Sequence, residues 1–181
     1  MNRKGFTLIE LLATIAILAL LMLVAVPNVM STIDKNKQDT YIEDAKRMIT
    51  LAEYKVRSDT NIELPTSGNC IVVPLGSLDL TDFTEGPEGG NYDLVNSYVV
   101  VGRTGSSYEY SVTIVENYDC STGEDGSQSC SSKRGLSLIT EDDLNKGSAR
   151  NSVYSNDDLN VVTPSVDLTL GSYTVTNIID S

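Results

Sequence analysis

The 181-residue sequence contains no histidine and no tryptophan. Without histidine, neither a histidine general base nor a histidine-ligated zinc site can form, which excludes the commonest enzyme designs. Basic residues are scarce in residues 58–181, which hold five Lys/Arg against nineteen Asp/Glu, a net charge of −14. Duplex nucleic acid requires a positive protein surface, so we expect no direct nucleic-acid binding by this acidic region. No cofactor is expected.

Cysteine is also scarce. Cys70, Cys120 and Cys130 are too few for a disulfide-dense scaffold, and they contain no C-x-x-C pair of the redox or zinc-knuckle type. In an exported domain they are compatible with one disulfide. Cys120 and Cys130 enclose nine residues and are the candidate pair, which would leave Cys70 buried as a small apolar residue. Pairing of Cys70 with either of the others is the alternative.

A long apolar run is present at the N-terminus. Phe6 to Val26 spans 21 residues with a single charge, Glu10. As a helix the run is about 31 Å long, which matches a hydrocarbon core of about 30 Å. Arg3 and Lys4 precede it, so the positive-inside rule places the N-terminus in the cytoplasm and the remainder outside. A secretory signal peptide is the alternative, but the run is too long and lacks an Ala-x-Ala site.

Beyond Pro27 the helical pattern becomes amphipathic. Apolar residues recur at steps of three and four, at Ile42, Ala45, Ile49, Ala52 and Val56. Pro27 cannot donate a backbone hydrogen bond, which predicts a kink between the two halves. We expect one helix from about Phe6 to Arg57, roughly 78 Å long, whose second half lies on a domain.

Residues 66–181 carry short apolar runs separated by turn residues, a pattern typical of strands. The predicted strands are "CIVVPL", the hairpin "SYVVVGRTGSSYEYSVTIVEN", "LNVVTP" and "SYTVTNII". In the second arm of the hairpin, Tyr108, Tyr110, Val112 and Ile114 alternate with polar residues, which predicts one buried and one wet face. The fold class expected is α+β, a long N-terminal helix packed on a small antiparallel sheet.

Acidic clusters raise the question of a metal site. In "ITEDDLNKG", Thr140 precedes three acids and Gly147 follows, which is typical of a capped short helix. The loop "NYDCSTGEDGSQSC" gathers Asp119, Glu124 and Asp125, whose oxygens calcium could use. Its spacing does not match an EF-hand, so a solvated loop is the favoured interpretation.

The segment "KGFTLIE" at residues 4–10, followed by the apolar run and Pro27, resembles the class III signal of type IV pilins and of the pseudopilins of type II secretion and DNA-uptake machines. In that family a membrane-embedded prepilin peptidase cuts after the glycine and methylates the new N-terminus. The resemblance implies cleavage between Gly5 and Phe6, N-methylation of Phe6, and Glu10 as the fifth mature residue. Glu10 would then pair with the Phe6 amine of an adjacent subunit.

The resemblance implies a pilin-like order of segments: a leader at residues 1–5, a transmembrane and polymerisation helix at 6–27, its amphipathic continuation at 28–57, and a globular head at 58–181. Its expected partners are the prepilin peptidase, other pilin subunits, the membrane and an assembly platform. The protein would begin as a single-pass protein of the cytoplasmic membrane and end in a cell-surface filament. The same N-terminus serves type IV pili, secretion pseudopili and competence pili.

Two observations weigh against a complete match. Many pilins have a glycine where this chain has Ala19, and a glutamate near a membrane edge can simply be tolerated. The alternative function is a single-pass, membrane-anchored extracellular binding domain or adhesin that does not polymerise, with Met1 intact or only methionine lost. An exported enzyme is poorly supported, since there is no histidine and no G-x-S-x-G.

Overall fold

The computed structural model describes residues 7–78, 84–123 and 127–179. The chain divides into two compact units, residues 1–36 and 37–181, and each is described by itself. Helix α1 (Leu8–Ser58) runs through the first unit and into the second. The prediction of one helix ending near Arg57 is confirmed.

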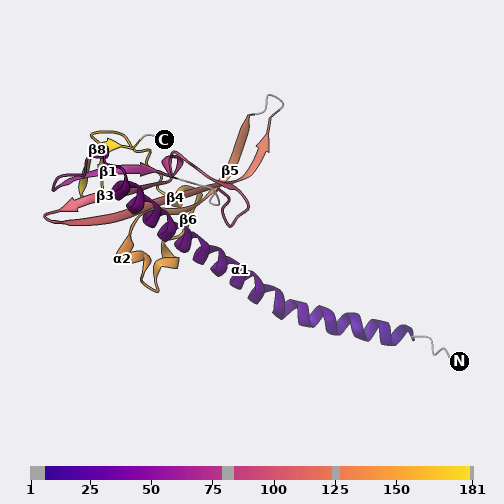
Figure 1. Cartoon of the computed structure of the whole chain (residues 1–181). Coiled ribbons are helices and arrows are strands. Elements are labelled where there is room, and N and C mark those ends of the chain that lie inside the picture. Colours follow the sequence, from indigo (N-terminus) through magenta and orange to yellow (C-terminus); the bar gives the residue numbers. More distant parts are fainter. Residues whose placement is uncertain (1–6, 79–83, 124–126, 180–181) are drawn as a thin grey trace. The chain divides into compact units, whose positions relative to one another are not determined.

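The second unit contains a single sheet, shown with α1 in Figure 1. Its strands are β1 (Asn69–Pro74), β2 (Asn91–Tyr92), β3 (Tyr98–Thr104), β4 (Ser107–Thr122), β5 (Gln128–Thr140), β6 (Tyr154–Ser155), β7 (Thr169–Leu170) and β8 (Tyr173–Ile178). Their order is β6-β5-β4-β3-β1-β8-β7, with β2 paired to β4. Among the described strands only β1 and β8 pair in parallel, so the α+β fold with a mostly antiparallel sheet is confirmed.

Short helices connect the later strands. They are η1 (Leu75–Ser77), α2 (Glu141–Leu144), η2 (Ala149–Ser152) and η3 (Asn156–Asp158). The Thr140 hydroxyl accepts a hydrogen bond from the Asp143 amide at 3.2 Å, so it caps α2 as the sequence predicts. The helix ends at Leu144, three residues before Gly147.

Both faces of the sheet are covered. On one face, Ile71, Val73, Val99 and Val101 pack with the buried side of α1. On the other, the intervening residues of β1 and β3 pack with Leu170 and Val175 and with half-buried residues of the C-terminal segment. The expected wet face is therefore wrong in the centre of β4, where Thr113 is fully buried. The predicted burial of Tyr108 is also wrong, because its ring is 36% exposed.

One predicted strand is irregular in the structure, and one strand of the structure has no matching prediction. "LNVVTP" is irregular rather than a strand, because side chains hold it in place: the Tyr98 hydroxyl donates to the Val162 carbonyl at 2.9 Å, and Thr163 donates to Asn96 at 2.8 Å. Strand β5 escaped prediction because its first half is serine-rich and shows no apolar alternation. Pairing with β4 decides its conformation.

A buried carboxylate fastens α1 to the sheet. Glu116 on β4 is fully buried and accepts hydrogen bonds from the Tyr41 hydroxyl at 2.5 Å and from the backbone amides of Glu88 and Gly90 at 3.0 and 2.8 Å. A Cβ at Gly86 or Gly90 would overlap the Glu116 carboxylate or the backbone of β4, so only glycine fits there. Burial, and then the hydrogen bond to Glu116, raises the pKa of Tyr41.

Ion pairs surround this buried carboxylate. Glu88 bridges Lys37 on α1 and Arg134 on β5, with N–O distances of 2.5 and 2.6 Å. Arg150 contacts Asp39 with two nitrogen atoms and so ties η2 to the same helix. These hydrogen bonds hold the pKa of Asp39 below its ordinary value. The helix from Lys37 onward is thus built into the head by charge as well as by apolar packing.

Replacing Glu116 by Gln tests this fastening. The Gln side chain places an amide group against backbone donors, so we expect the free energy of unfolding to fall by about 2–3 kcal/mol. Unfolding of the full chain in detergent micelles, followed by near-UV circular dichroism of its nine tyrosines, measures the change. Glu109→Gln, at an exposed carboxylate on the same strand, is the control. Equal effects of the two variants would contradict the role of Glu116.

Candidate assembly site in the amino-terminal helix

The candidate cleavage and methylation residues, Gly5 and Phe6, lie outside the residues that the structure describes. The described chain begins at Thr7, immediately before α1. The structural evidence on the N-terminal motif therefore comes from Thr7, Glu10 and the helix that follows.

Thr7 and Glu10 form a reciprocal capping box. The Thr7 amide and hydroxyl donate to Glu10 Oε2 at 2.9 and 2.8 Å, and the Glu10 amide donates to the Thr7 hydroxyl at 3.4 Å. This arrangement satisfies backbone donors that the first turn of a helix leaves free, and it places a negative charge at the positive end of the helix dipole. Glu10 therefore has a local function in starting α1, which the sequence interpretation missed although "TLIE" fits the capping pattern.

Exposed apolar side chains cover the N-terminal half of α1 on all sides. Sixteen large apolar side chains between Leu8 and Ile33 are each at least 45% exposed. The helix is long and apolar enough to cross a membrane, with a mean hydropathy of 2.8 over its most apolar window and none of that window buried. An exposed apolar surface of this extent requires lipid or other apolar helices around it.

Pro27 lies inside α1, which continues on both sides of it. A proline has no backbone N–H, so the Leu23 carbonyl one turn earlier receives no helical hydrogen bond from position 27. The neighbouring Val24 carbonyl accepts a side-chain hydrogen bond from Asn28 Nδ2 at 3.2 Å. Thr32 also donates to a carbonyl one turn earlier, that of Asn28, at 2.9 Å. The Val24 and Asn28 carbonyls near the proline thus each have a side-chain donor.

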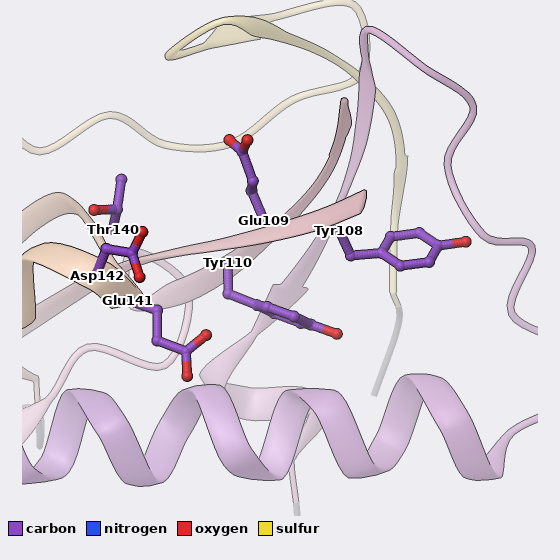
Figure 2. A pocket seen from close by; sticks show the side chains of 6 residues that line it. All are labelled: Tyr108, Glu109, Tyr110, Thr140, Glu141 and Asp142. Carbon is purple, nitrogen blue, oxygen red and sulfur yellow. The ribbon is translucent and has the colours of Figure 1, made fainter. Parts of the chain in front are cut away.

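A pocket of about 250 Å3 opens on the head, lined by Tyr108, Glu109, Tyr110, Thr140, Glu141 and Asp142. Figure 2 shows Glu141 on the same side of β4 as the Tyr110 ring, whereas the Glu109 side chain points to the opposite side of the strand. Burial raises the pKa of Tyr110, as do the negative charges of Glu53 and Glu141. The lining of the pocket is acidic and aromatic.

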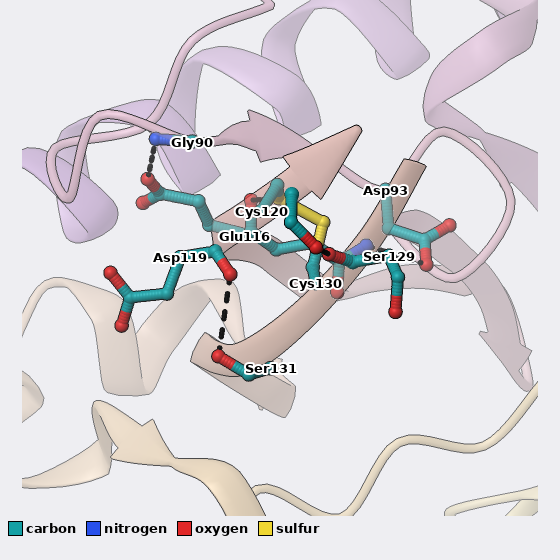
Figure 3. Close-up of a disulfide and its surroundings, with 10 residues drawn as sticks. Gly90, Asp93, Glu116, Asp119, Cys120, Ser129, Cys130 and Ser131 are labelled. Atoms are coloured by element: carbon teal, nitrogen blue, oxygen red, sulfur yellow. Dashed lines mark hydrogen bonds between the residues drawn. A yellow bond between two sulfur atoms is a disulfide. The ribbon is translucent and has the colours of Figure 1, made fainter. Parts of the chain in front are cut away.

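Cys120 and Cys130 face each other across β4 and β5 and form a disulfide with an S–S distance of 2.02 Å (Figure 3). The two strands extend beyond the sheet as a hairpin whose far half pairs with no other described strand (Figure 1). Because an isolated two-stranded hairpin is marginally stable in water, the disulfide holds this one in register. Cys70 is free and buried, and burial raises the pKa of its thiol to about 11.

The calcium candidates are described only in part. Glu124 and Asp125 lie outside the described residues. Asp119 is described, and its backbone carbonyl accepts a hydrogen bond from the Ser131 hydroxyl at 3.3 Å, as Figure 3 shows. Within residues 7–78, 84–123 and 127–179, no group of three or more acidic or cysteine side chains is placed to hold a metal ion.

Comparison with known proteins gives one match. The family model of the prokaryotic N-terminal methylation motif matches residues 1–26. No curated protein and no solved structure matches the chain.

The fold and the N-terminal helix therefore define a membrane-length helix continued into an α+β head, a pilin-like architecture. The methylation motif is typical of type IV pilins and pseudopilins, so the chain carries the recognition motif of that class. The class is generally non-enzymatic, and its motif implies processing by a prepilin peptidase and attachment to a membrane or pilus.

Loss of the disulfide should loosen only the hairpin. In a Cys120→Ser, Cys130→Ser double variant we expect faster amide exchange in the paired ends of β4 and β5, with the local opening free energy lower by about 2–3 kcal/mol. Hydrogen-exchange mass spectrometry measures this. A Ser121→Ala, Ser129→Ala double variant changes the same hairpin but keeps the disulfide, and should exchange like the parent chain. Faster exchange throughout β1 and β3 would contradict a local role.

Proposed function

We propose that this chain is the prepilin of a type IV pilus or pseudopilus subunit, cleaved after Gly5, N-methylated at Phe6 and polymerised through its N-terminal helix. The observation that carries the proposal is the coincidence of the methylation motif with a fully exposed apolar helix in the first unit. In such a subunit the apolar segment that first directs the chain to the membrane is kept after cleavage and becomes the interface between subunits. A methylation motif directly before a membrane-length helix fits this use.

The driving force for assembly follows from the exposed apolar surface. Before assembly, residues 6–27 lie in the cytoplasmic membrane with the head, residues 58–181, outside. Outside the membrane the same side chains would face water unless neighbouring helices covered them. Each Å2 of apolar surface removed from water stabilises the filament by about 25 cal/mol. Packing the helices of adjacent subunits together therefore provides a large favourable term per subunit.

Glu10 has two successive tasks in this proposal. In the separate subunit its carboxylate accepts hydrogen bonds from Thr7 in the capping box. In a filament core an ionised carboxylate is costly unless it is paired, and cleavage after Gly5 creates the partner, the N-terminal amine of Phe6 on a neighbour. Methylation leaves that amine able to carry a proton at neutral pH. Pro27 and Asn28 form the second assembly element, where the helix lacks a backbone donor.

The alternative is a membrane-anchored extracellular binding domain or adhesin that does not polymerise. Only the exposed hairpin and the acidic pocket favour it, since both offer surface to a partner. A domain that does not polymerise would not explain why Glu10 and the methylation motif occur together.

Mass spectrometry of the membrane-embedded or exported protein tests the processing. We expect a mature chain that begins at N-methylated Phe6 and a precursor of full length when the prepilin peptidase gene is deleted. Leu8→Ala, which leaves Gly5 and Phe6 unchanged, is a control for effects of substitution near the site. An intact Met1, or removal of methionine alone, in cells with an active peptidase would support the anchored alternative.

Two variants separate the roles of Glu10. Glu10→Gln keeps a capping oxygen but loses the negative charge, so we expect normal processing, a normal helix and loss of most filaments. Thr7→Ala lowers helix stability by about 1 kcal/mol but keeps the charge, so filaments should persist. Sheared surface filaments, quantified by immunoblot against total mature protein, measure both effects. Abundant filaments from Glu10→Gln, with none from Thr7→Ala, would show that capping alone matters.

A further inference from the structure

The face of α1 that points away from the sheet carries a regular stripe of exposed residues. Its members are three and four positions apart, so they lie along one side of the helix. We call this set the outer stripe: Thr40, Glu43, Arg47, Thr50, Tyr54 and Arg57, each of which is exposed. The opposite side of the same helix forms the core of the head.

Tyr54 stands out within the outer stripe. Its side chain is 72% exposed, more than any other large apolar or aromatic side chain in the described part of residues 37–181. It borders a shallow groove of about 390 Å3 formed with Thr50, Glu53, Arg57 and Ser58. Tyrosine and arginine are the residue types that most often dominate binding energy at protein interfaces. The stripe therefore has the composition of an interface, and the described residues of its own chain leave most of Tyr54 exposed.

Charge identifies the kind of partner. Residues 37–58 carry five Lys/Arg and four Asp/Glu, whereas residues 59–181 carry five and nineteen. The remainder of the head thus has a net charge of −14, and two such surfaces repel each other when subunits meet. The outer stripe carries Arg47 and Arg57, of which Arg57 pairs with Glu53 at 2.6 Å, so an acidic surface meets less repulsion there than over residues 59–181.

The chain itself offers acidic surfaces of this kind. Glu141 and Asp142, at the start of α2, are exposed and line the pocket in Figure 2 together with Tyr110. An arginine that reaches such a surface finds carboxylates for ion pairs and an aromatic ring for a cation–π contact. Both halves of a complementary contact are thus present on one chain, and a second copy is the partner that brings them together.

We propose that the outer stripe docks, through Tyr54 and Arg47, on the acidic head surface of a second copy of this chain. The inference rests on the proposed function, because polymerisation brings copies side by side. The contact joins two different surfaces, so it is heterologous and can be repeated from subunit to subunit without closing. It adds a salt-sensitive contact between heads to the apolar contact between N-terminal helices.

Photocrosslinking from the stripe tests the partner. With p-benzoylphenylalanine in place of Tyr54 in the full-length chain, irradiation of cells should give a covalent dimer of the chain, with the adduct within residues 59–181 of the second copy. The same amino acid at Tyr154, an exposed aromatic on β6, should give at least roughly tenfold less dimer. No dimer, equal dimer from both positions, or an adduct on a different protein or on residues 7–36 would overturn the proposal.

Charge reversal tests the electrostatics. Using that same photocrosslinker, Arg47→Glu should reduce the Tyr54 dimer roughly tenfold, and Lys133→Glu, an equal change at an exposed residue of β5, should leave it within about twofold. In isolated membranes the dimer should decrease as the salt concentration rises. Both residues are exposed, and unchanged near-UV circular dichroism of each variant confirms folding. Equal reduction by both variants, or no reduction by Arg47→Glu, contradicts the contact.

The outcomes also separate this inference from the proposed function. Dimers from Tyr54 in a chain that keeps Met1 and forms no filaments would support the stripe and reject the prepilin assignment. Filaments of methylated subunits without Tyr54 dimers would reject the stripe alone.

Discussion

The constraint on which the rest of the structure depends is the solvation of the N-terminal half of α1. Apolar side chains cover this segment on all sides, and a helix of this length satisfies its own backbone hydrogen bonds, so lipid or other helices can surround it without polar partners. Water cannot, because the exposed apolar surface is too large. A soluble head attached to such a helix must complete its own core, since the first half of α1 can contribute nothing to it.

The head meets this requirement by taking the second half of α1 into its core. From Lys37 onward the helix is amphipathic, and its apolar side packs on the sheet. Polar groups reinforce the contact where β4 passes beneath the helix: Glu116 accepts the Tyr41 hydroxyl and two loop amides. A fully buried carboxylate is tolerated because each oxygen has donors, and removal of one partner would leave an uncompensated charge. From Lys37 onward the helix is consequently a structural element of the head, whereas the part before Lys37 is apolar, exposed and of membrane length.

Glu10 illustrates how one residue can satisfy different requirements in different states. At the free N-terminus of α1 it completes a capping box with Thr7. In the proposed filament it neutralises an amine that proteolysis creates. Both states satisfy the same physical condition, that a carboxylate in apolar surroundings needs donors. In the proposed function, the exchange of Thr7 for the Phe6 amine would link processing to assembly. The acidic head adds a second condition, since subunits of equal charge can pack closely only where basic residues interrupt the negative surface.

Much of the secondary structure and the N-terminal motif could be predicted from the amino-acid sequence. The length and purity of the apolar run define a membrane-length helix, because helix rise and bilayer thickness are fixed quantities. The three- and four-residue spacing from Ile42 to Val56 identifies the face of α1 that is buried, and "KGFTLIE" lies within the matched N-terminal methylation motif. Local patterns also place β1, the β3–β4 turn, β8 and the Thr140 cap, since turn chemistry and alternation act over a few residues.

Other features depend on contacts between distant residues. Strand β5 exists because β4 provides a pairing edge, and the "LNVVTP" segment stays irregular because Tyr98 and Asn96 hold it by side-chain bonds. Thr113 is fully buried, and its hydroxyl accepts a hydrogen bond from the Leu138 amide of β5, 25 residues later in the chain, at 3.0 Å. The network of Glu116, Tyr41 and Glu88 joins three separate parts of the chain. The sequence by itself determined the helix, its apolar and amphipathic halves and the methylation motif, since these follow from local composition. Only the tertiary structure decided which polar groups are buried and which tyrosine stays exposed, because burial is set by what the fold brings on top of each residue.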